Sequence, residues 1–187
     1  MDDSLDEGKR LVLLLGGARA GKSAYALRLA EGSESIPGRR VCFIATAQAL
    51  DEDMSRRIDR HRRERHSHWQ TIEEPYQIDK ALRQAGDCAV VIVDCLTLLV
   101  SNWLLREEDE QKCEQILRQI TSDFLSTARS HRQTIICVSN EVGLGVVPET
   151  RLGRIFRDLL GRVNQDFSQA ADDVYLLVAG LKVQLKP

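Results

Sequence analysis

The stretch LVLLLGGARAGKS, residues 11–23, decides the fold. Five consecutive apolar residues, Leu11 to Leu15, predict a buried strand, and a helical pattern follows Ser23. Between them, GGARAGKS matches the phosphate-binding pattern G-x-x-x-x-G-K-[ST], in which backbone N–H groups and a helix N-terminus surround phosphate oxygens. The residues therefore predict a nucleoside triphosphate site. The alternative is a glycine-rich turn that Lys-Ser follows by chance.

Side chains in and near this loop have predicted roles. Lys22 is expected to reach the β- and γ-phosphates and to be catalytic, and Ser23 offers a hydroxyl ligand for Mg²⁺. A carboxylate at the end of a neighbouring strand usually helps to hold such a metal, and Asp94 ends the apolar run AVVIVD. Asp94 could instead cap the helix that follows it. Thr46, at the end of VCFIAT, is a weaker candidate on the same ground.

The rest of the chain repeats the order of strand and helix. Its apolar runs are continuous, which suits strands that are buried on both faces of a parallel sheet. Helical patterns follow the runs, so we expect βαβ units with right-handed crossovers. The expected strands are residues 11–15, 41–46, 89–94, 134–139 and 174–179. The expected helices are residues 21–31, 52–65, 76–85, 96–106, 111–130 and 151–171.

These elements predict an α/β fold with a P-loop NTPase-like (RecA-like), mostly parallel sheet flanked by helices. Ala179-Gly180-Leu181 separates VYLLV from KVQLK, which predicts a C-terminal β-hairpin at the sheet edge. We expect a flexible N-terminal extension at residues 1–10 and a single P-loop domain at residues 11–187. The expected loops are residues 32–40, 106–111 and 141–149.

Composition narrows the class of protein. The 187 residues are 43% hydrophobic and 29% charged, which argues against disorder, and 26 Lys and Arg against 28 Asp and Glu give a net charge of −2. Such a balance implies neither a nucleic acid nor an anionic membrane as a partner. Five cysteines without C-x-x-C spacing predict reduced thiols and a cytoplasmic location. The acidic N-terminus predicts neither a signal peptide nor an integral membrane segment.

A strongly basic segment, RRIDRHRRER at residues 56–65, contains six arginines. On a helix, Met54, Ile58, His61 and Arg65 would fall on one stripe. One interpretation is a solvated, salt-bridged helix with His61 at the edge of its apolar face. The other is a polyphosphate clamp with a nucleophilic histidine at its centre, since neighbouring guanidinium groups disfavour a charged imidazole and stabilise charge on a phosphoryl group.

Two further histidines, His66 and His68, lie just beyond this segment. They could be mistaken for metal ligands, but no third ligand is evident, so we interpret them as surface residues.

Five segments carry a resemblance to a known family. They are GGARAGKSAYALRLAE, FIATAQALDEDMSRRIDRHRRERHSHWQTIEEP, VIVDCLTLLVSNWL, VSNEVGLGVVPETRLGRIFRDLLGRVNQ and AADDVYLLVAGLKVQLK. In this order and spacing, from about residue 11 to 186, the chain resembles the bifunctional adenosylcobinamide kinase / adenosylcobinamide-phosphate guanylyltransferases of cobalamin biosynthesis.

The resemblance implies two reactions. ATP or GTP phosphorylates the aminopropanol hydroxyl of adenosylcobinamide. GTP then guanylylates an enzyme histidine with loss of pyrophosphate, and adenosylcobinamide phosphate takes the GMP to give adenosylcobinamide-GDP. It also implies a homo-oligomer, in particular a trimer.

The resemblance places the guanylylated histidine at His61. Three departures from the family pattern are the ten leading residues, Ala20 where serine is frequent, and Arg60 where a second histidine can occur. The nucleotide-binding residues that it implies are Gly16, Gly17, Ala18, Arg19, Ala20, Gly21, Lys22, Ser23, Ala45, Thr46, Ala47, Arg62, Arg63, Glu64, Arg65, Glu73 and Asp94.

The roles of several residues stay open when only the sequence is considered. Glu141 is one candidate for the base of the kinase step, and a loop residue without chemistry is the alternative. Arginines on the expected helix 151–171 meet either a corrinoid phosphate or a neighbouring subunit, or else belong to a plain surface helix; they are Arg151, Arg154, Arg157 and Arg162.

Two rival functions also remain. One is a monofunctional small-molecule kinase that uses the same loop. The other is a nucleic-acid-dependent ATPase or binding module, in which the basic segment follows a phosphate backbone. Near that segment only Trp69 could stack on a base, which argues against the second rival.

Overall fold

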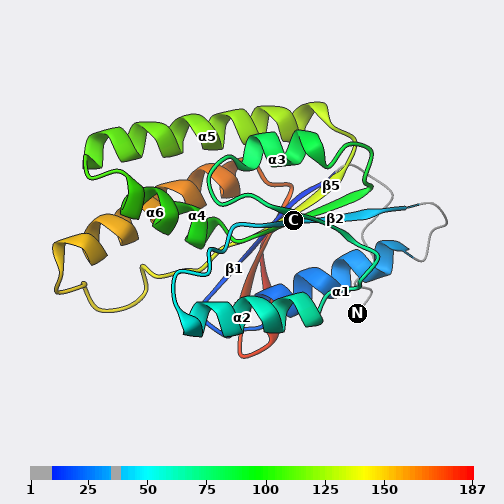
Figure 1. The fold of residues 1–187 in the computed structure, drawn as a ribbon, viewed down its shortest axis with the longest axis horizontal. Coiled ribbons are helices and arrows are strands. Elements are labelled where there is room, and N and C mark those ends of the chain that lie inside the picture. The colour runs from blue at the N-terminus through cyan, green and yellow to red at the C-terminus, as the bar shows by residue number, and fades with distance from the viewer. Residues whose placement is uncertain (1–9, 35–38) are drawn as a thin grey trace.

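A seven-stranded sheet forms the centre of the computed structural model, which describes residues 10–34 and 39–187 (Figure 1). The strand order is β3-β2-β4-β5-β1-β6-β7. All neighbours pair in parallel except β6 and β7, which are antiparallel. The strands are β1 (Leu11–Gly16), β2 (Val41–Ala45), β3 (Gln70–Glu73), β4 (Val90–Asp94), β5 (Thr134–Val138), β6 (Asp173–Val178) and β7 (Leu181–Lys186).

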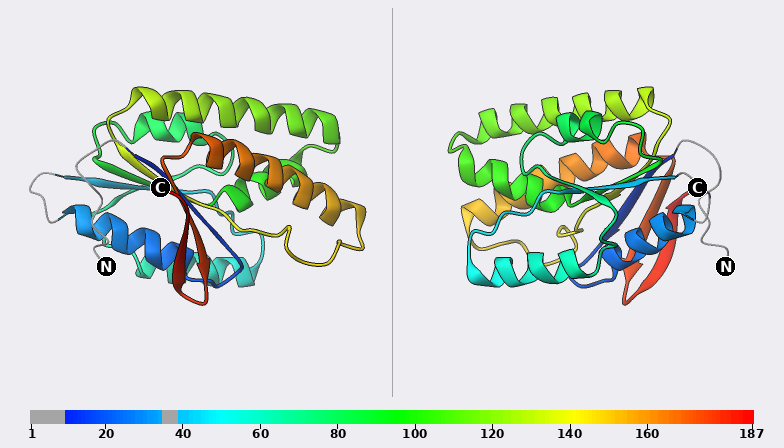
Figure 2. Two further views of the ribbon diagram at one scale, coloured as in Figure 1. Left: turned by 180° about the vertical axis from the view of Figure 1, so that it is seen from behind. Right: turned by 45° about the vertical axis from the view of Figure 1, so that its right-hand side comes forward.

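Helices cover both faces of the sheet (Figures 1 and 2). On one side lie α1 (Lys22–Glu34) and α2 (Glu52–Arg63). Among the described residues, no helix combines the length and apolar character that crossing a bilayer requires. The helices on the other side are α3 (Ile78–Gln84), α4 (Leu96–Arg106), α5 (Glu110–Ser130) and α6 (Arg151–Ala170).

The two layers of helices make two hydrophobic cores, one on each face of the sheet. Leu13 belongs to the core under α3 to α6, whereas its neighbour Leu14 belongs to the core under α1, and both are fully buried. Successive side chains of a strand point to opposite faces, so a strand between two cores needs apolar residues at every position. This requirement explains the continuous apolar runs and confirms the α/β interpretation.

The C-terminal hairpin is confirmed, whereas β3 was not predicted. β3 reads QTIE and lies at the sheet edge with three of its four residues exposed, so it has no apolar run to identify it. Helix α1 continues to Glu34, into the expected loop 32–40, and α2 ends at Arg63, two residues early. Residues 1–9 lie outside the described residues, so the N-terminal extension stays a prediction.

The topology brings the candidate site residues to one edge of the sheet. All parallel strands end on the same side of a sheet, here called its carboxyl-terminal edge, and ligands of open α/β sheets bind there. β5 lies between β1 and β4, and Val138 is in register with Asp94 on one side and with Leu14 on the other. The loop after β1 and the carboxylate that ends β4 therefore lie at the same edge, with one strand between them.

Gly16 lets β1 lie close to β6. Its φ is +146°, and a Cβ atom there would lie 2.3 Å from the carbonyl oxygen of Leu177. We expect Gly16→Ala to lower the free energy of unfolding by roughly 2–4 kcal/mol, because backbone must move to relieve the overlap. Denaturant titration measures this change.

Gly17→Ala is the matched control, since a Cβ atom at Gly17 would meet nothing within 4 Å. Its stability should stay within about 1 kcal/mol of wild type. Equal stability of the two variants would contradict the close approach of β1 and β6.

Candidate active site

The phosphate-binding loop lies between β1 and α1, as the sequence predicts. Lys22 begins α1 and is only 7% exposed. Its Nζ donates hydrogen bonds to the carbonyl oxygens of Gly16 at 2.9 Å and Gly17 at 2.7 Å. Burial lowers the pKa of Lys22, while Cys95 and Asp94 act in the opposite direction. The ammonium is thus held in the loop close to the carboxylate that ends β4.

The other loop residues divide into buried and exposed groups. Ala20 is buried in the core under α1, and its N–H donates to the carbonyl oxygen of Gly17 at 3.2 Å. Gly17, Ala18 and Arg19 are exposed. The backbone of these three residues is therefore open to an approaching anion.

The hairpin turn between β6 and β7 closes over the loop, a contact that sequence reasoning missed. Gly180 N–H donates to the carbonyl oxygen of Ala20 at 3.0 Å, and a Cβ atom at Gly21 would lie 3.3 Å from Gly180 Cα. Lys182, just past the turn, donates to the hydroxyl of Tyr25 on α1 at 2.9 Å. No local motif identifies a contact between segments so far apart in the chain.

Three residues that the sequence resemblance implies as nucleotide-binding lie in one row across the sheet. They are Ala45, Glu73 and Asp94. Ala45 is in register with Glu73 of β3 on one side and with Asp94 of β4 on the other. The N-cap residue of α4 is Cys95, and no side chain caps that helix. The Asp94 carboxylate is therefore not used as a helix cap, and it interacts electrostatically with Lys22 and Arg65 instead.

Thr46 is fully buried, and its hydroxyl is already engaged. It donates to the carbonyl oxygen of Cys95 and accepts from the Cys95 N–H, both at 2.8 Å. Asn102 of α4 donates to the carbonyl oxygens of Thr46 at 2.8 Å and Pro75 at 2.9 Å. These bonds tie the ends of β2 and β4 to α4, so Thr46 shapes the edge of the site, and its contact with a nucleotide stays a prediction.

Cys95 does not provide a reactive thiolate at this edge. Its burial, and secondly the neighbouring Asp94, raise its pKa to about 12. The thiol is therefore neutral at physiological pH and is a poor nucleophile.

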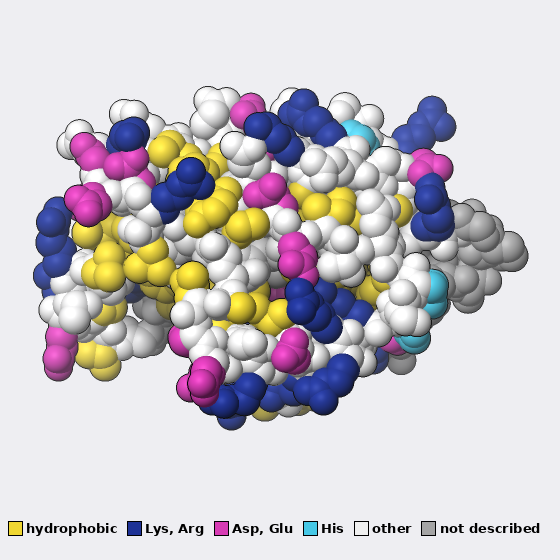
Figure 3. Space-filling model, viewed as in Figure 1, with side chains coloured by type: hydrophobic (Ala, Val, Ile, Leu, Met, Phe, Trp, Pro, Cys, Tyr) yellow, Lys and Arg dark blue, Asp and Glu magenta, His cyan; other side chains and the backbone are white. Residues whose placement is uncertain are grey.

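Helix α2 carries the basic segment along one side of the molecule, where lysine and arginine side chains gather (Figure 3). The predicted stripe holds for Met54, Ile58 and His61, which are half-buried on α2. Arg65 is also half-buried but lies two residues beyond the end of the helix, and we call these four residues the inward stripe. By contrast, no residue of α2 is fully buried. The helix therefore lies against the molecule by one face and contributes nothing to either core.

His61 is on this inward stripe, and its side chain is 32% exposed. Its Nδ1 lies 3.5 Å from Oε2 of Glu64, so its neighbours include a carboxylate as well as guanidinium groups. Arg60, the departure from the family pattern, also lies near Glu64, at 3.9 Å. His61 thus has the exposure that a nucleophile needs.

Arg65 joins the basic segment to the sheet. Its guanidinium carbon lies 3.5 Å from the centre of the Phe43 ring, and its buried Nε has no hydrogen-bond partner among the described residues. Burial lowers the pKa of Arg65, and Asp94 is the largest opposing influence. Asp94 therefore interacts with the loop cation Lys22 and with the last residue of the inward stripe.

The other implied residues of the basic segment are exposed. Arg62 pairs with Glu73, which raises the pKa of Arg62. Arg63 donates from Nε to the carbonyl oxygen of Asp59 at 3.2 Å. These contacts support the salt-bridged interpretation for the outer face of α2.

His66 and His68 lie beyond α2 as expected. His66 contacts Glu31 of α1 at 3.0 Å, and its ring centre lies 5.5 Å from that of His68. Among the described residues, no three His, Cys, Asp or Glu side chains gather as a metal site.

The arginines of α6 have partners on the protein. Arg151 pairs with Glu110, and Arg154 donates to the carbonyl oxygens of Pro148 and Glu149. Arg157 pairs with Asp158, and Arg162 with Glu114. These contacts favour the interpretation of a plain surface helix.

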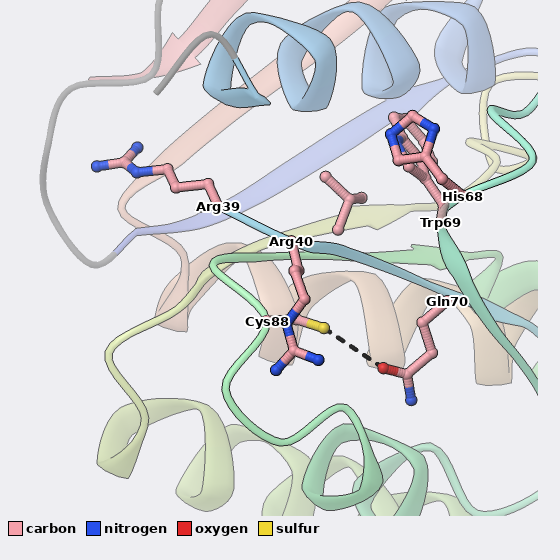
Figure 4. Close-up of a pocket in the computed structure, with 7 residues that line it drawn as sticks. Arg39, Arg40, His68, Trp69, Gln70 and Cys88 are labelled. Carbon is pink, nitrogen blue, oxygen red and sulfur yellow. Dashed lines mark hydrogen bonds between the residues drawn. The ribbon is translucent and has the colours of Figure 1, made fainter. Parts of the chain in front are cut away.

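A pocket lined by arginine and histidine side chains lies at the opposite end of the strands, where β2 and β3 begin (Figure 4). Val41 and Gln70, the first residues of β2 and β3, line it, so it is far along the strands from the phosphate-binding loop. Arg39 points away from the other labelled side chains, and Arg40 pairs with Asp87. This pocket does not belong to the candidate active site.

The comparisons with known proteins agree with the geometry. The family model described as cobinamide kinase / cobinamide phosphate guanyltransferase matches residues 12–185. The chain is 37% identical to the bifunctional adenosylcobalamin biosynthesis protein CobU of Escherichia coli, over 94% of this chain and 99% of the relative. It is 43% identical to CobP of Pseudomonas aeruginosa, which has the same description, over 93% of this chain and 96% of the relative.

Solved structures support the fold alone. The flagellar accessory protein FlaH of Methanocaldococcus jannaschii is 17% identical with a TM-score of 0.57, and the match covers 96% of this chain and 79% of that one. A solved ATPase domain is 20% identical with a TM-score of 0.53, covering 90% and 69%. The P-loop NTPase-like architecture is confirmed.

The hydroxyl of Thr46 offers a test of its role. We expect Thr46→Val to lower the free energy of unfolding by about 1–3 kcal/mol, because the part-buried N–H of Cys95 loses its bond to the hydroxyl and the Cys95 carbonyl keeps only its bond from the Leu99 N–H. Thr46→Ser keeps the hydroxyl and should stay closer to wild type. Thermal unfolding and GTP titration, measured together, separate stability from binding.

A Thr46→Val variant with wild-type stability that no longer binds GTP would contradict this structural role and make Thr46 a direct ligand.

Proposed function

Because the chain belongs to the cobinamide kinase / cobinamide phosphate guanyltransferase family, we propose that it catalyses both reactions of that name. It phosphorylates adenosylcobinamide with ATP or GTP. It then transfers GMP from GTP through a guanylyl-histidine at His61 to adenosylcobinamide phosphate, which yields adenosylcobinamide-GDP and pyrophosphate.

One observation carries the assignment of both reactions to one site. Lys22 of the phosphate-binding loop and Arg65 of the inward stripe both interact with Asp94. His61 lies in the last turn of α2, which ends at Arg63, and it precedes Arg65 by four residues in the chain. A triphosphate held by the loop would therefore lie near the C-terminal end of α2, where His61 is found.

The guanylyl transfer proceeds in two displacements. A ring nitrogen of His61 attacks the α-phosphorus of GTP, the bond to the bridging oxygen of the β-phosphate breaks, and pyrophosphate leaves with that oxygen. A phosphate oxygen of the corrinoid then attacks the guanylyl phosphorus, the P–N bond breaks, and His61 is regenerated. Arginines of α2 offset the repulsion between the anionic partners.

In the kinase step the main task of the protein is to position the two reactants and to neutralise the charge of the phosphate oxygens. Phosphoryl transfer needs its two reactants aligned and its oxygen charges stabilised. Lys22 and the backbone N–H groups of residues 17–23 would align the triphosphate and stabilise the charge on its oxygens. The remaining nucleotide contacts of the family pattern, including Ala45, Ala47, Arg62, Arg63, Glu64 and Glu73, belong to this proposal.

Mg²⁺ fits the donor atoms at this edge. The hydroxyl of Ser23, in the first turn of α1, and the carboxylate of Asp94 are oxygen donors, which Mg²⁺ prefers, and Mg²⁺ typically uses one or two protein ligands beside phosphate oxygens and water. When bound, the ion neutralises charge on the phosphate oxygens.

We also propose a homo-oligomer, with a trimer implied by the sequence resemblance, and a cytoplasmic location. The hairpin supports the first, because large apolar side chains on it are half or more exposed, which is typical of a surface that another chain covers. They are Val178, Leu181, Val183 and Leu185. The five free thiols are compatible with a reducing compartment.

The alternative function, binding of a nucleic acid, would need an exposed aromatic ring on which a base could stack. Trp69 is 6% exposed and packs in the core under α1, so its ring is not available to stack on a base. Submicromolar binding of single-stranded oligonucleotides with a steep salt dependence would revive that alternative.

Labelling with GTP that carries ³²P at the α-phosphate tests the histidine intermediate. We expect wild-type protein to acquire a label that is acid-labile and alkali-stable, as a phosphoramidate is, and His61→Ala to lose at least 99% of it. His68→Ala, a histidine outside the basic segment, should label like wild type.

A wild-type protein that phosphorylates adenosylcobinamide but never acquires label would reduce the chain to a monofunctional kinase. Labelling of His61→Ala at the wild-type level would move the intermediate to another residue.

A further inference from the structure

Glu141 lies beside the phosphate-binding loop, and neither the guanylyl transfer nor the metal site uses it. Its backbone N–H donates to the carbonyl oxygen of Gly16 at 3.1 Å. The Nζ of Lys22 donates to the same oxygen at 2.9 Å. Two donor atoms that share one acceptor oxygen lie within about two hydrogen-bond lengths of each other, so Lys22 Nζ is close to the backbone nitrogen of Glu141. The backbone of Glu141 therefore lies beside the loop lysine, which in this loop pattern reaches the β- and γ-phosphates.

The segment that carries Glu141 is held firmly after β5. The Ser139 hydroxyl donates to Oδ1 of Asn164 on α6 at 2.6 Å, and both side chains are buried. Nδ2 of Asn164 donates to the carbonyl oxygen of Asn140 at 3.0 Å, and the Asn140 N–H donates to Thr97 of α4 at 2.7 Å. Buried and mutually satisfied polar groups of this kind fix a backbone in one position.

The Glu141 carboxylate is half-buried and available to accept a proton. Its Oε1 accepts from the Gly143 N–H at 2.6 Å, which orients the group. No lysine, arginine or histidine of the described residues forms an ion pair with it. By contrast, Glu73 pairs with Arg62, and Asp94 interacts with two cations.

We propose that Glu141 is the general base of the kinase step, an inference that rests on the proposed function. The Glu141 carboxylate takes the proton of the aminopropanol hydroxyl as its oxygen attacks the γ-phosphorus. The bond between the γ-phosphorus and the bridging oxygen breaks, and the nucleoside diphosphate leaves with the electron pair. The proton on Glu141 then passes to solvent.

Steady-state kinetics of Glu141→Gln with adenosylcobinamide and ATP tests the assignment. The amide oxygen of glutamine can still accept from the Gly143 N–H, so the segment should keep its shape. We expect kcat to fall at least 100-fold, the usual contribution of a general base, with KM for ATP within about threefold of wild type. The acidic limb of the pH profile of kcat should disappear.

Glu149→Gln is the matched control, because Glu149 is an exposed carboxylate on the same loop. Its kcat should stay within about twofold of wild type. Glu141→Asp keeps a carboxylate and should recover part of the lost rate together with the acidic limb.

Other results overturn the inference. Wild-type kcat and an unchanged pH profile in Glu141→Gln would exclude a base at this position. Equal loss of kinase activity and of guanylyl labelling, with a lower unfolding midpoint, would show a structural role. A wild-type protein that labels with GTP but never phosphorylates adenosylcobinamide would overturn the proposed kinase function itself, and the base with it.

Discussion

A buried lysine ammonium at the first turn from strand to helix is the constraint on which the site depends. Moving a charge out of water is costly, and burial accordingly lowers the pKa of Lys22. The carbonyl oxygens of Gly16 and Gly17 and the charge of Asp94 offset that cost. A triphosphate would add negative charge beside the buried cation, so the loop is suited to an anion.

The two halves of the site differ in how firmly the fold holds them. The loop is tied to β6, to the hairpin turn and to the segment after β5 by backbone contacts. Helix α2 has no buried residue; its Arg62 pairs with Glu73 of β3, and Arg65, two residues after the helix, packs on Phe43 of β2. Segments with few buried contacts open at low free-energy cost. We therefore expect α2 to adjust its position around a nucleotide while the loop stays fixed.

Sequence patterns identified the parts of this molecule that local physics determines. Continuous apolar runs predicted five strands of the sheet, and helical spacing placed Ile58 and His61 on the half-buried face of α2. Contacts between distant segments left no such signal. The bond from Gly180 to Ala20 and the engagement of the Thr46 hydroxyl by Cys95 depend on how strands are ordered in the sheet. Strand β3 was missed because an exposed edge strand needs no apolar run.

The most direct test of the account is a crystal structure with Mg²⁺ and a GTP analogue that cannot be cleaved between its α- and β-phosphates. The account predicts the triphosphate within residues 16–23, with Lys22 Nζ turned from the Gly16 and Gly17 carbonyl oxygens toward phosphate oxygens and a ring nitrogen of His61 facing the α-phosphorus. A triphosphate bound at the opposite edge of the sheet, beside Arg40 and His68, with Lys22 still on those carbonyl oxygens, would contradict it.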